Sequence, residues 1–192
     1  MNQMPEVSIT AEAKQWLDLY IATADGEISG LGTVRLYDGR LIITDIHLLE
    51  QECSATSTAL SEEDVASFLL QTVRLGLDPS ELKLWWHSHA HMNVFWSKTD
   101  DDTAGNFGNG WMLSIVGNKR GHYLCRFDLY DPVRLTIDQI PILTLPIYNP
   151  ELLAAIKAEV AEKVTTTPVL PYSFRPYAAD LTLSDPDWSE NW

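Results

Sequence analysis

The chain has 192 residues, with 27 acidic and 13 basic side chains, and its formal net charge is −14 at pH 7. This charge argues against a nucleic-acid partner, because binding a phosphate backbone depends on lysine and arginine side chains. No apolar run reaches the roughly 18 residues of a membrane helix, and the start, MNQMPEVSIT, has neither the basic nor the apolar stretch of a signal peptide. Composition therefore predicts a cytoplasmic protein with one hydrophobic core and no membrane partner.

Helical and extended patterns alternate along the chain. Apolar residues recur at helical spacing from Thr10 to Ala22, with Trp16 and Leu17 expected on the buried face. The Asp38-Gly39 pair predicts a hairpin turn, since both residues tolerate a positive φ. In chain order, the predicted elements are a helix over 10–22, strands over 27–36 and 40–49, a helix over 61–76, strands over 82–89, 111–117 and 122–130, an extended segment over 133–145 and a helix over 149–164.

The order of these elements predicts one α/β (or α+β) domain with a single main sheet. Pro141 and Pro146 would confine segment 133–145 to an edge of that sheet, because proline donates no ladder hydrogen bond. Composition and pattern together divide the chain into a domain over 1–148, a C-terminal helix over 149–164 and a proline-rich, acidic tail over 165–192.

The stretch WWHSHAHMNVFWSKTDDD, residues 85–102, carries the candidate chemistry. On a strand, His87 and His89 lie two residues apart and point to the same face. Two imidazoles make half of a zinc site, and a third ligand can come from Asp100, Asp101 or Asp102, which follow closely. Three protein ligands leave the fourth position of zinc for water, which is the arrangement of a hydrolytic site.

The spacing of this stretch is specific: H-S-H is followed by seven residues, Ser97, two residues and Asp100. It resembles the motif of the JAMM (MPN+) metalloprotease family, in which a glutamate precedes H-S/T-H-x7-S-x2-D. The order of predicted elements over roughly residues 7–145 is also similar to that family. The resemblance implies a single MPN (JAB)-like domain, with a mixed central sheet flanked by helices, and one bound zinc ion. It also implies an isopeptidase that acts on conjugates of ubiquitin or of a ubiquitin-like protein.

The resemblance gives each motif residue a role. His87, His89 and Asp100 would bind zinc, and Ser97 would polarise the scissile carbonyl and stabilise its oxyanion. Glu27, in EISGLGTV on the first strand after the first helix, occupies the place of the family glutamate. It would take a proton from the zinc-bound water, which is the nucleophile, and pass it to the leaving lysine amine. A bacterial system of ubiquitin-like conjugation is one setting for such an enzyme.

The sequence departs from the family pattern directly after the second histidine. Many members carry proline there, whereas this chain has Ala90 and His91. His91 leaves a different ligand set open, although Asp100 fits the spacing and a third strand histidine would crowd one face. Ser97 and Asp100 taken alone also fit a helix capping box. Cys53 has no nearby histidine in the sequence, so a cysteine protease is not expected.

Two other functions stay open at this point. A non-catalytic MPN-type scaffold would bind partners through its sheet and its acidic tail, and the loss of a ligand would favour it. A JAB-type peptidase of phage assembly or of sulfur-carrier processing would use the same metal chemistry on another substrate. No motif of the chain identifies the modifier, its target, the linkage preference or the oligomeric state.

Overall fold

The computed structural model describes residues 5–53, 58–59, 62–107, 110–147 and 150–163. The chain divides into two units, Met1–Tyr148 and Asn149–Trp192. The second unit contains α4 (Pro150–Lys163). Position 61, where the predicted helix over 61–76 begins, and the predicted tail 165–192 lie outside the described residues. Within those residues no helix is both long and apolar enough to cross a membrane.

The first unit contains the sheet, three α-helices and a short 3-10 turn among its described residues. Its elements, in chain order, are β1 (Glu6–Thr10), α1 (Ala11–Thr23), β2 (Ser29–Tyr37), β3 (Arg40–Leu48), β4 (Glu52–Cys53), β5 (Thr58–Ala59), α2 (Glu62–Arg74), η1 (Pro79–Glu81), β6 (Leu82–Ser88), α3 (Lys98–Asn106), β7 (Trp111–Gly117), β8 (Tyr123–Leu129), β9 (Leu135–Ile137) and β10 (Ile142–Leu145).

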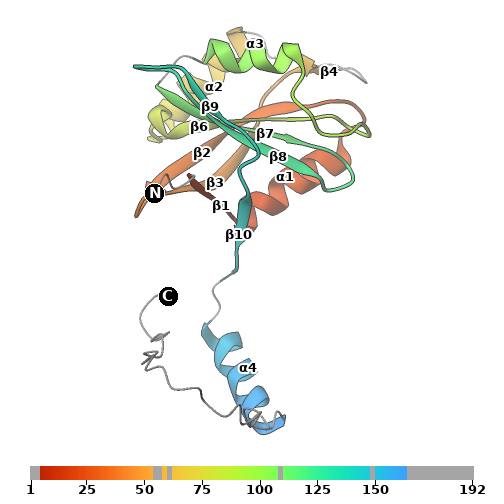
Figure 1. Cartoon of the computed structure of the whole chain (residues 1–192), viewed down its shortest axis with the longest axis vertical. Coiled ribbons are helices and arrows are strands. Elements are labelled where there is room, and N and C mark those ends of the chain that lie inside the picture. The colour runs from red at the N-terminus through yellow and green to blue at the C-terminus, as the bar shows by residue number, and fades with distance from the viewer. Residues whose placement is uncertain (1–4, 54–57, 60–61, 108–109, 148–149, 164–192) are drawn as a thin grey trace, which may run out of the picture. The chain divides into compact units, whose positions relative to one another are not determined.

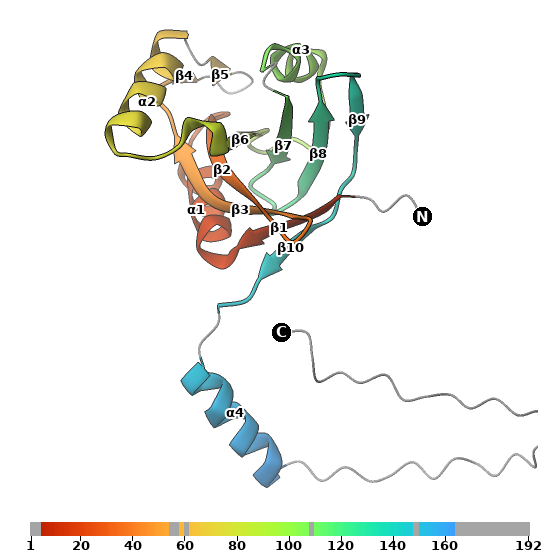
Figure 2. The same cartoon turned by 90° about the vertical axis from the view of Figure 1, so that its left-hand side faces the viewer.

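Eight strands of the described chain form one mixed sheet, in the order β10-β1-β3-β2-β6-β7-β8-β9. β1 runs parallel to β3 and β10, and β6 runs parallel to β7, while the other neighbours are antiparallel. The sheet curls, with α1 against one face and α2 and α3 against the other (Figure 1, Figure 2). The mixed sheet and its helices make an α/β fold, as the order of predicted elements indicates.

Segment 133–145 supplies both edges of the sheet. β9 pairs with β8 at one edge, and β10 pairs with β1 at the other. Pro141 and Pro146 flank β10 directly, which agrees with the predicted edge position. The pairing of β10 with β1 does not follow from the pattern of the sequence, because β1 is only five residues long and runs without a turn into α1.

α1 packs on the sheet through Ala13, Leu17 and Ile21, which are all buried. The hydroxyl of Thr10 caps this helix by accepting a hydrogen bond from the Ala13 amide at 3.1 Å. The prediction that Trp16 lies on the buried face is wrong, because its side chain is 50% exposed. The buried residues recur every four positions, so Trp16 falls at the margin of the stripe, where its ring lies against that of Tyr20.

The opposite face of the sheet carries a second, smaller core. Trp85 of β6 and Met112 of β7 are buried there beneath Ala104 of α3, and Val65 and Phe68 of α2 pack against them. The two tryptophans that precede the histidines therefore serve opposite faces: Trp86 lies in the core under α1, and Trp85 in the core under α2 and α3. Strand periodicity then places His87 on the face of Trp85.

A close approach between strands requires glycine in β2. Gly30 pairs with Trp86 of β6 and with Leu48 of β3. A Cβ atom at Gly30 would lie 2.1 Å from the His47 carbonyl oxygen and 2.7 Å from the Trp86 ring. The buried Trp86 indole also donates a hydrogen bond to the Leu31 carbonyl at 3.0 Å. The missing side chain at position 30 therefore lets Trp86 lie across β2 and brings β2 and β6 into register.

We expect Gly30→Ala to lower the free energy of unfolding by about 3 kcal/mol, because the added methyl group has no room between β3 and Trp86. Gly39→Ala is the matched control: Gly39 has φ +75° and nothing within 4 Å of the added Cβ, so only left-handed backbone strain of about 1 kcal/mol is added. Urea denaturation of both variants measures the difference. Equal losses would show that the space at Gly30 is not restrictive.

Candidate metal centre

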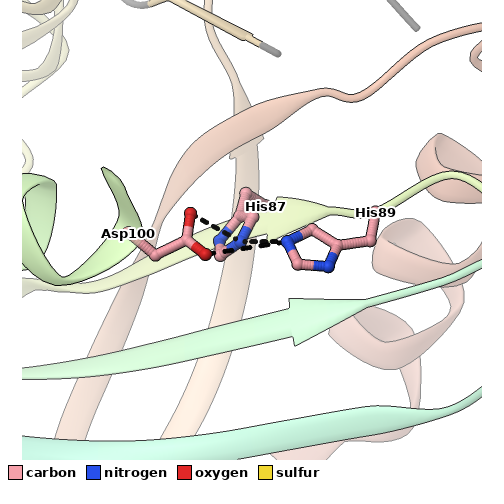
Figure 3. A group of neighbouring side chains, drawn as sticks. All are labelled: His87, His89 and Asp100. Carbon is pink, nitrogen blue, oxygen red and sulfur yellow. Dashed lines mark hydrogen bonds and ion pairs between the residues drawn. The ribbon is translucent and has the colours of Figure 1, made fainter. Parts of the chain in front are cut away.

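His87 and His89 come from the end of β6, where the backbone is held on both sides. His87 pairs with Ser29 of β2 and with Val116 of β7. The ladder continues past the strand end, since the Ser88 amide donates to the Ile28 carbonyl at 2.8 Å and the His89 amide to the Gly117 carbonyl at 2.9 Å. Both histidines are buried, and both point to the face of the sheet that α3 covers (Figure 3).

Asp100 completes a group of three ligating side chains. His87 Nε2 lies 3.2 Å from Asp100 Oδ1 and 3.3 Å from His89 Nε2, and His89 Nε2 lies 3.6 Å from Asp100 Oδ2 (Figure 3). A tetrahedral ion with bonds of about 2.0–2.1 Å holds its ligand atoms about 3.3 Å apart. The three side chains are buried, and their ligand atoms all lie within 4.8 Å of one another. The group could therefore bind a metal ion.

The capping box at the start of α3 positions Asp100. Ser97 is the N-cap, and its hydroxyl accepts a hydrogen bond from the Asp100 amide at 3.2 Å. In return, Asp100 Oδ2 accepts from the Ser97 amide at 2.7 Å. Asp100 therefore belongs both to a helix cap, which is present as the sequence allowed, and to the buried group that could bind a metal.

The other ring nitrogen of His89 has a partner that fixes its orientation. His89 Nδ1 lies 3.1 Å from the Asn93 carbonyl oxygen, and an Nδ1–H that donates there leaves the Nε2 lone pair for a metal. The turn that presents this carbonyl is held in two places. The Met92 amide donates to the His89 carbonyl at 2.7 Å, and the buried Asn118 side chain donates to the Met92 carbonyl at 2.8 Å.

The charges of the group suit a cation. Burial lowers the pKa of His87 below its ordinary value, against the opposing effect of Asp100. Burial acts in the same direction on His89, but hydrogen bonds to Asp100 and to the Asn93 carbonyl outweigh it and raise the pKa of His89. For Asp100, burial alone would raise the pKa, yet hydrogen bonds from both histidines hold it far below its usual range. Asp100 is thus an ionised carboxylate that accepts hydrogen bonds from the imidazoles, and a bound cation would take the place of those protons.

Glu27 lies next to this group from the β2 side. The antiparallel register Ser29–His87 and Ile28–Ser88 places Glu27 opposite His89, on the same face of the sheet. Its side chain is only 7% exposed, and no described residue forms a hydrogen bond with Oε1. Burial raises the pKa of Glu27; His89 lowers it and Asp100 raises it further. This buried carboxyl can therefore hold a proton beside the metal-binding group.

The sequence prediction placed Glu27 on a strand, but β2 begins two residues later, at Ser29. Gln51 extends the strand pairing at this end. Its side-chain amide accepts from the Ser29 amide at 2.8 Å and donates to the Ser29 carbonyl at 2.9 Å. Two glutamates near the neighbouring strands differ from Glu27: Glu50 is exposed, and Glu81 pairs with Arg35 at 3.4 Å. The side chain of Glu52 lies outside the described part of the structure.

Aromatic rings enclose the two histidines. Trp85 stacks on His87 with ring centres 4.6 Å apart, and Phe95 meets His89 edge-on at 4.6 Å. On another side, the ring centre of Trp96 lies 5.9 Å from that of His87. These rings exclude water from the buried part of the group and restrict rotation of the imidazoles. Trp85 therefore belongs to the second core and also forms one wall around His87.

The remaining motif residues lie as follows. His91 is exposed and does not belong to the buried group of His87, His89 and Asp100. Asp101, on the first turn of α3, and Asp102, directly after it, are both exposed. Two residues at the site were missed by sequence reasoning: Asn118, which holds the turn after His89, and Arg126, which pairs with Asp101. A charged residue inside the apolar strand YLCRFDL was the available signal for Arg126.

The comparisons with known proteins concern the fold and give no information on the chemistry of the site. No protein-family model matches the sequence, and no curated protein matches it. The structure is similar to the solution structure of protein DSY2949 from Desulfitobacterium hafniense, with a TM-score of 0.54. The match covers 73% of this chain and 95% of that chain at 12% sequence identity. A similarity at this level of identity concerns the α/β fold alone.

We expect Asp100→Ala to lower metal affinity by more than about 100-fold, since even the loss of an outer hydrogen-bonding partner costs roughly 10–100-fold. Asp100→Asn, which keeps an oxygen for the Ser97 amide, should act in the same direction and separates ligation from helix capping. His91→Ala is the control and should bind metal as the parent does. Metal content after dialysis, together with competition against a chromophoric chelator, measures these effects. Loss of metal in His91→Ala with retention in Asp100→Ala would reverse the ligand assignment.

Proposed function

We propose that the protein is a zinc-dependent isopeptidase of the JAMM (MPN+) type. It hydrolyses the bond between the C-terminus of ubiquitin or a ubiquitin-like protein and a lysine amine, or processes the precursor of such a modifier, in the cytoplasm. One observation carries the proposal: His87, His89 and Asp100, spaced in sequence as in that motif, converge at tetrahedral distances beside the buried Glu27. All three ligand positions hold ligating side chains, which favours an enzyme over a scaffold.

The donor set fits zinc. Two imidazole nitrogens and one carboxylate oxygen form a common set for catalytic zinc, which keeps a further position open. His87 Nε2, His89 Nε2 and the Asp100 carboxylate would hold the ion. When bound, zinc supplies a Lewis acid that lowers the pKa of water to about 7 and polarises a carbonyl.

Glu27 moves the proton in this proposal. A general base must accept a proton from the attacking water and return one to the leaving amine, so its pKa should lie between those of the two groups. Burial raises the pKa of Glu27, and the register places it across from His89. The carboxyl oxygen that lacks a described partner is the atom available to the proton. The raised pKa favours donation to the amine in the second half of the reaction.

Ser97 and the start of α3 stabilise negative charge on the substrate. The Ser97 hydroxyl oxygen accepts from the Asp100 amide, which leaves the hydroxyl hydrogen to donate to the carbonyl oxygen under attack. The amino end of α3 adds the positive end of its dipole at the same place. An oxyanion that forms there gains a hydrogen bond and a favourable field, and neither requires rearrangement of the helix.

The departure from the family motif after the second histidine has a structural reason. Ala90 has φ +42°, and proline, whose φ is fixed near about −65°, could not adopt this conformation. The turn is built from hydrogen bonds instead, with Asn118 in support. The difference therefore concerns how the turn is made and does not remove a ligand. We also assign the α/β fold to the MPN (JAB) type, which the motif and the order of elements support.

We expect a chelator to abolish hydrolysis of a modifier–lysine conjugate, and thiol alkylation to leave it unchanged. Cys125 is buried, and burial raises the pKa of its thiol to about 12, so it offers no thiolate. The measurement is release of the modifier after dialysis against chelator, with metal content determined in the same sample. Readdition of zinc should restore the rate. Cleavage that persists in a sample shown to be free of metal would rule out this mechanism.

We expect Glu27→Gln to keep the fold and the metal but to lower turnover by roughly 10²–10⁴-fold, which is the contribution of a general base. Glu50→Gln and Glu81→Gln, which remove carboxylates of the same kind away from the histidines, should stay within a few-fold of the parent by the same reasoning. Turnover and zinc content are measured on all three variants. Near-normal cleavage by zinc-loaded Glu27→Gln would place the base elsewhere.

A further inference from the structure

Arg126 is a buried cation close to the metal-binding group. It lies in β8, opposite Ser114 of β7, and only 5% of it is exposed. Arg126 and Asp128 are two residues apart on the strand and share one face, which α3 covers. A buried guanidinium is costly unless its hydrogen bonds and charge are met, so its contacts indicate why it is there.

The contacts of Arg126 reach the start of α3 on both sides of Asp100. Its Nη1 lies 2.5 Å from Asp101 Oδ1, and its Nη2 donates to the Asp100 carbonyl at 3.5 Å. The guanidinium carbon lies 4.2 Å from the ring centre of Trp96, directly before the N-cap. On the strand, Arg126 Nε lies 3.1 Å from Asp128 Oδ2 as an ion pair. The guanidinium thus connects β8 to the residues that flank Asp100.

Other hydrogen bonds hold the later part of α3, since the Tyr130 hydroxyl donates to the Ala104 carbonyl at 2.6 Å and Arg134 donates to the Gly105 carbonyl at 3.0 Å. A cavity of about 300 Å³ lies between α3 and β8, lined by Asp101, Gly105, Arg126, Arg134 and their neighbours. The capping box holds the Asp100 side chain relative to its own helix, but it does not hold that helix relative to the histidines on β6. A metal site tolerates errors of only about ±0.2 Å in its ligand distances. Some contact must therefore fix the first turn of α3 against the sheet.

We propose that Arg126 is the positioning residue that sets metal affinity: it fixes the first turn of α3 against β8 and thereby holds Asp100 at the distance that His87 and His89 require. This inference rests on the proposed metal-dependent function. The planar guanidinium suits the task, because it can pair with two carboxylates and stack on an indole at the same time. Lysine carries the same charge but cannot make these contacts together.

The chain provides a matched control at the other end of α3. Arg134 donates to the Gly105 carbonyl at 3.0 Å and lies 5.9 Å from the ring centre of Tyr130. It connects the end of the same helix to the same side of the sheet, and it makes no contact with Asp100 among the described residues. Arg126 and Arg134 therefore separate positioning of the ligand from general attachment of the helix.

The first experiment compares Asp101→Asn with Asp102→Asn. Both acids are exposed neighbours near the start of α3, and both substitutions remove one negative charge near the site. Of these two acids, only Asp101 pairs with Arg126 among the described residues. We expect Asp101→Asn to weaken zinc binding about tenfold, at the lower end of the effect of outer partners, and Asp102→Asn to change it less than about twofold. Competition with a chromophoric chelator measures the affinity of the full chain.

The second experiment compares Arg126→Lys with Arg134→Lys. We expect Arg126→Lys to weaken zinc binding by roughly 10–100-fold and Arg134→Lys to leave it nearly unchanged. Melting of the metal-free proteins gives the readout that separates the roles: a merely structural Arg126 would lower the melting temperature and leave metal affinity as it is. If Arg126→Lys does not fold, the comparison of Asp101→Asn with Asp102→Asn still tests the role of Arg126, because both aspartate side chains are exposed.

The failures of the two proposals are distinguishable. A parent protein that binds no zinc overturns both the proposed function and this inference. A parent that binds zinc, with Asp101→Asn and Arg126→Lys binding it equally well, overturns the role of Arg126 alone. Equal losses of zinc affinity in Asp101→Asn and Asp102→Asn would show that the negative charge alone sets the affinity. That result also overturns the role of Arg126.

Discussion

The two oxygens of Asp100 perform different tasks, and the arrangement of the site depends on both. Oδ2 accepts the Ser97 amide and so closes the capping box, while Oδ1 faces His87 at 3.2 Å. A carboxylate buried without such bonds would cost several kcal/mol and would take up a proton. Because the cap fixes its rotamer, the place of the third ligand follows from the place where α3 begins. The helix cap and the candidate metal site therefore share one side chain, that of Asp100.

The strands position the histidines of the site, because successive side chains of a strand point to opposite faces of the sheet. Along β6, Trp86 enters the core under α1, while Trp85 and His87 face α3. Gly30 leaves room for Trp86 on one face of β2, and the same register sets Ser29 opposite His87 on the other. Ser29 accepts the Trp85 indole N–H at 2.9 Å, which orients the ring that stacks on His87. Packing on the α1 face therefore also fixes where Trp85 and His87 lie on the opposite face of the sheet.

The three candidate ligands could be predicted from the sequence because their spacing depends on local geometry. Two lie on one strand end, and the third follows a short connecting segment at a helix cap. The order of the longer strands and helices could also be predicted from periodicity, and the prolines indicated the edge position of β10. The pairing of β1 with β3 and β10 could not, since strand partners are set by tertiary contacts. The same holds for Arg126 and Asn118, whose partners lie about 25 residues away in sequence. Trp16 was misplaced because helical periodicity locates a stripe but not its margins.

Charge balance links the buried groups of the two proposals. Among the described residues, the buried acids are Glu27, Asp100 and Asp128, and the buried guanidinium is that of Arg126. Arg126 pairs with Asp128, so neither Glu27 nor Asp100 has a buried guanidinium as its partner among the described residues. When both are ionised, these two carboxylates carry the charge that one divalent cation neutralises. Without a cation, burial instead raises the pKa of Glu27, which lets it keep a proton. A cation at the histidines would therefore favour ionised Glu27, the form that a general base requires.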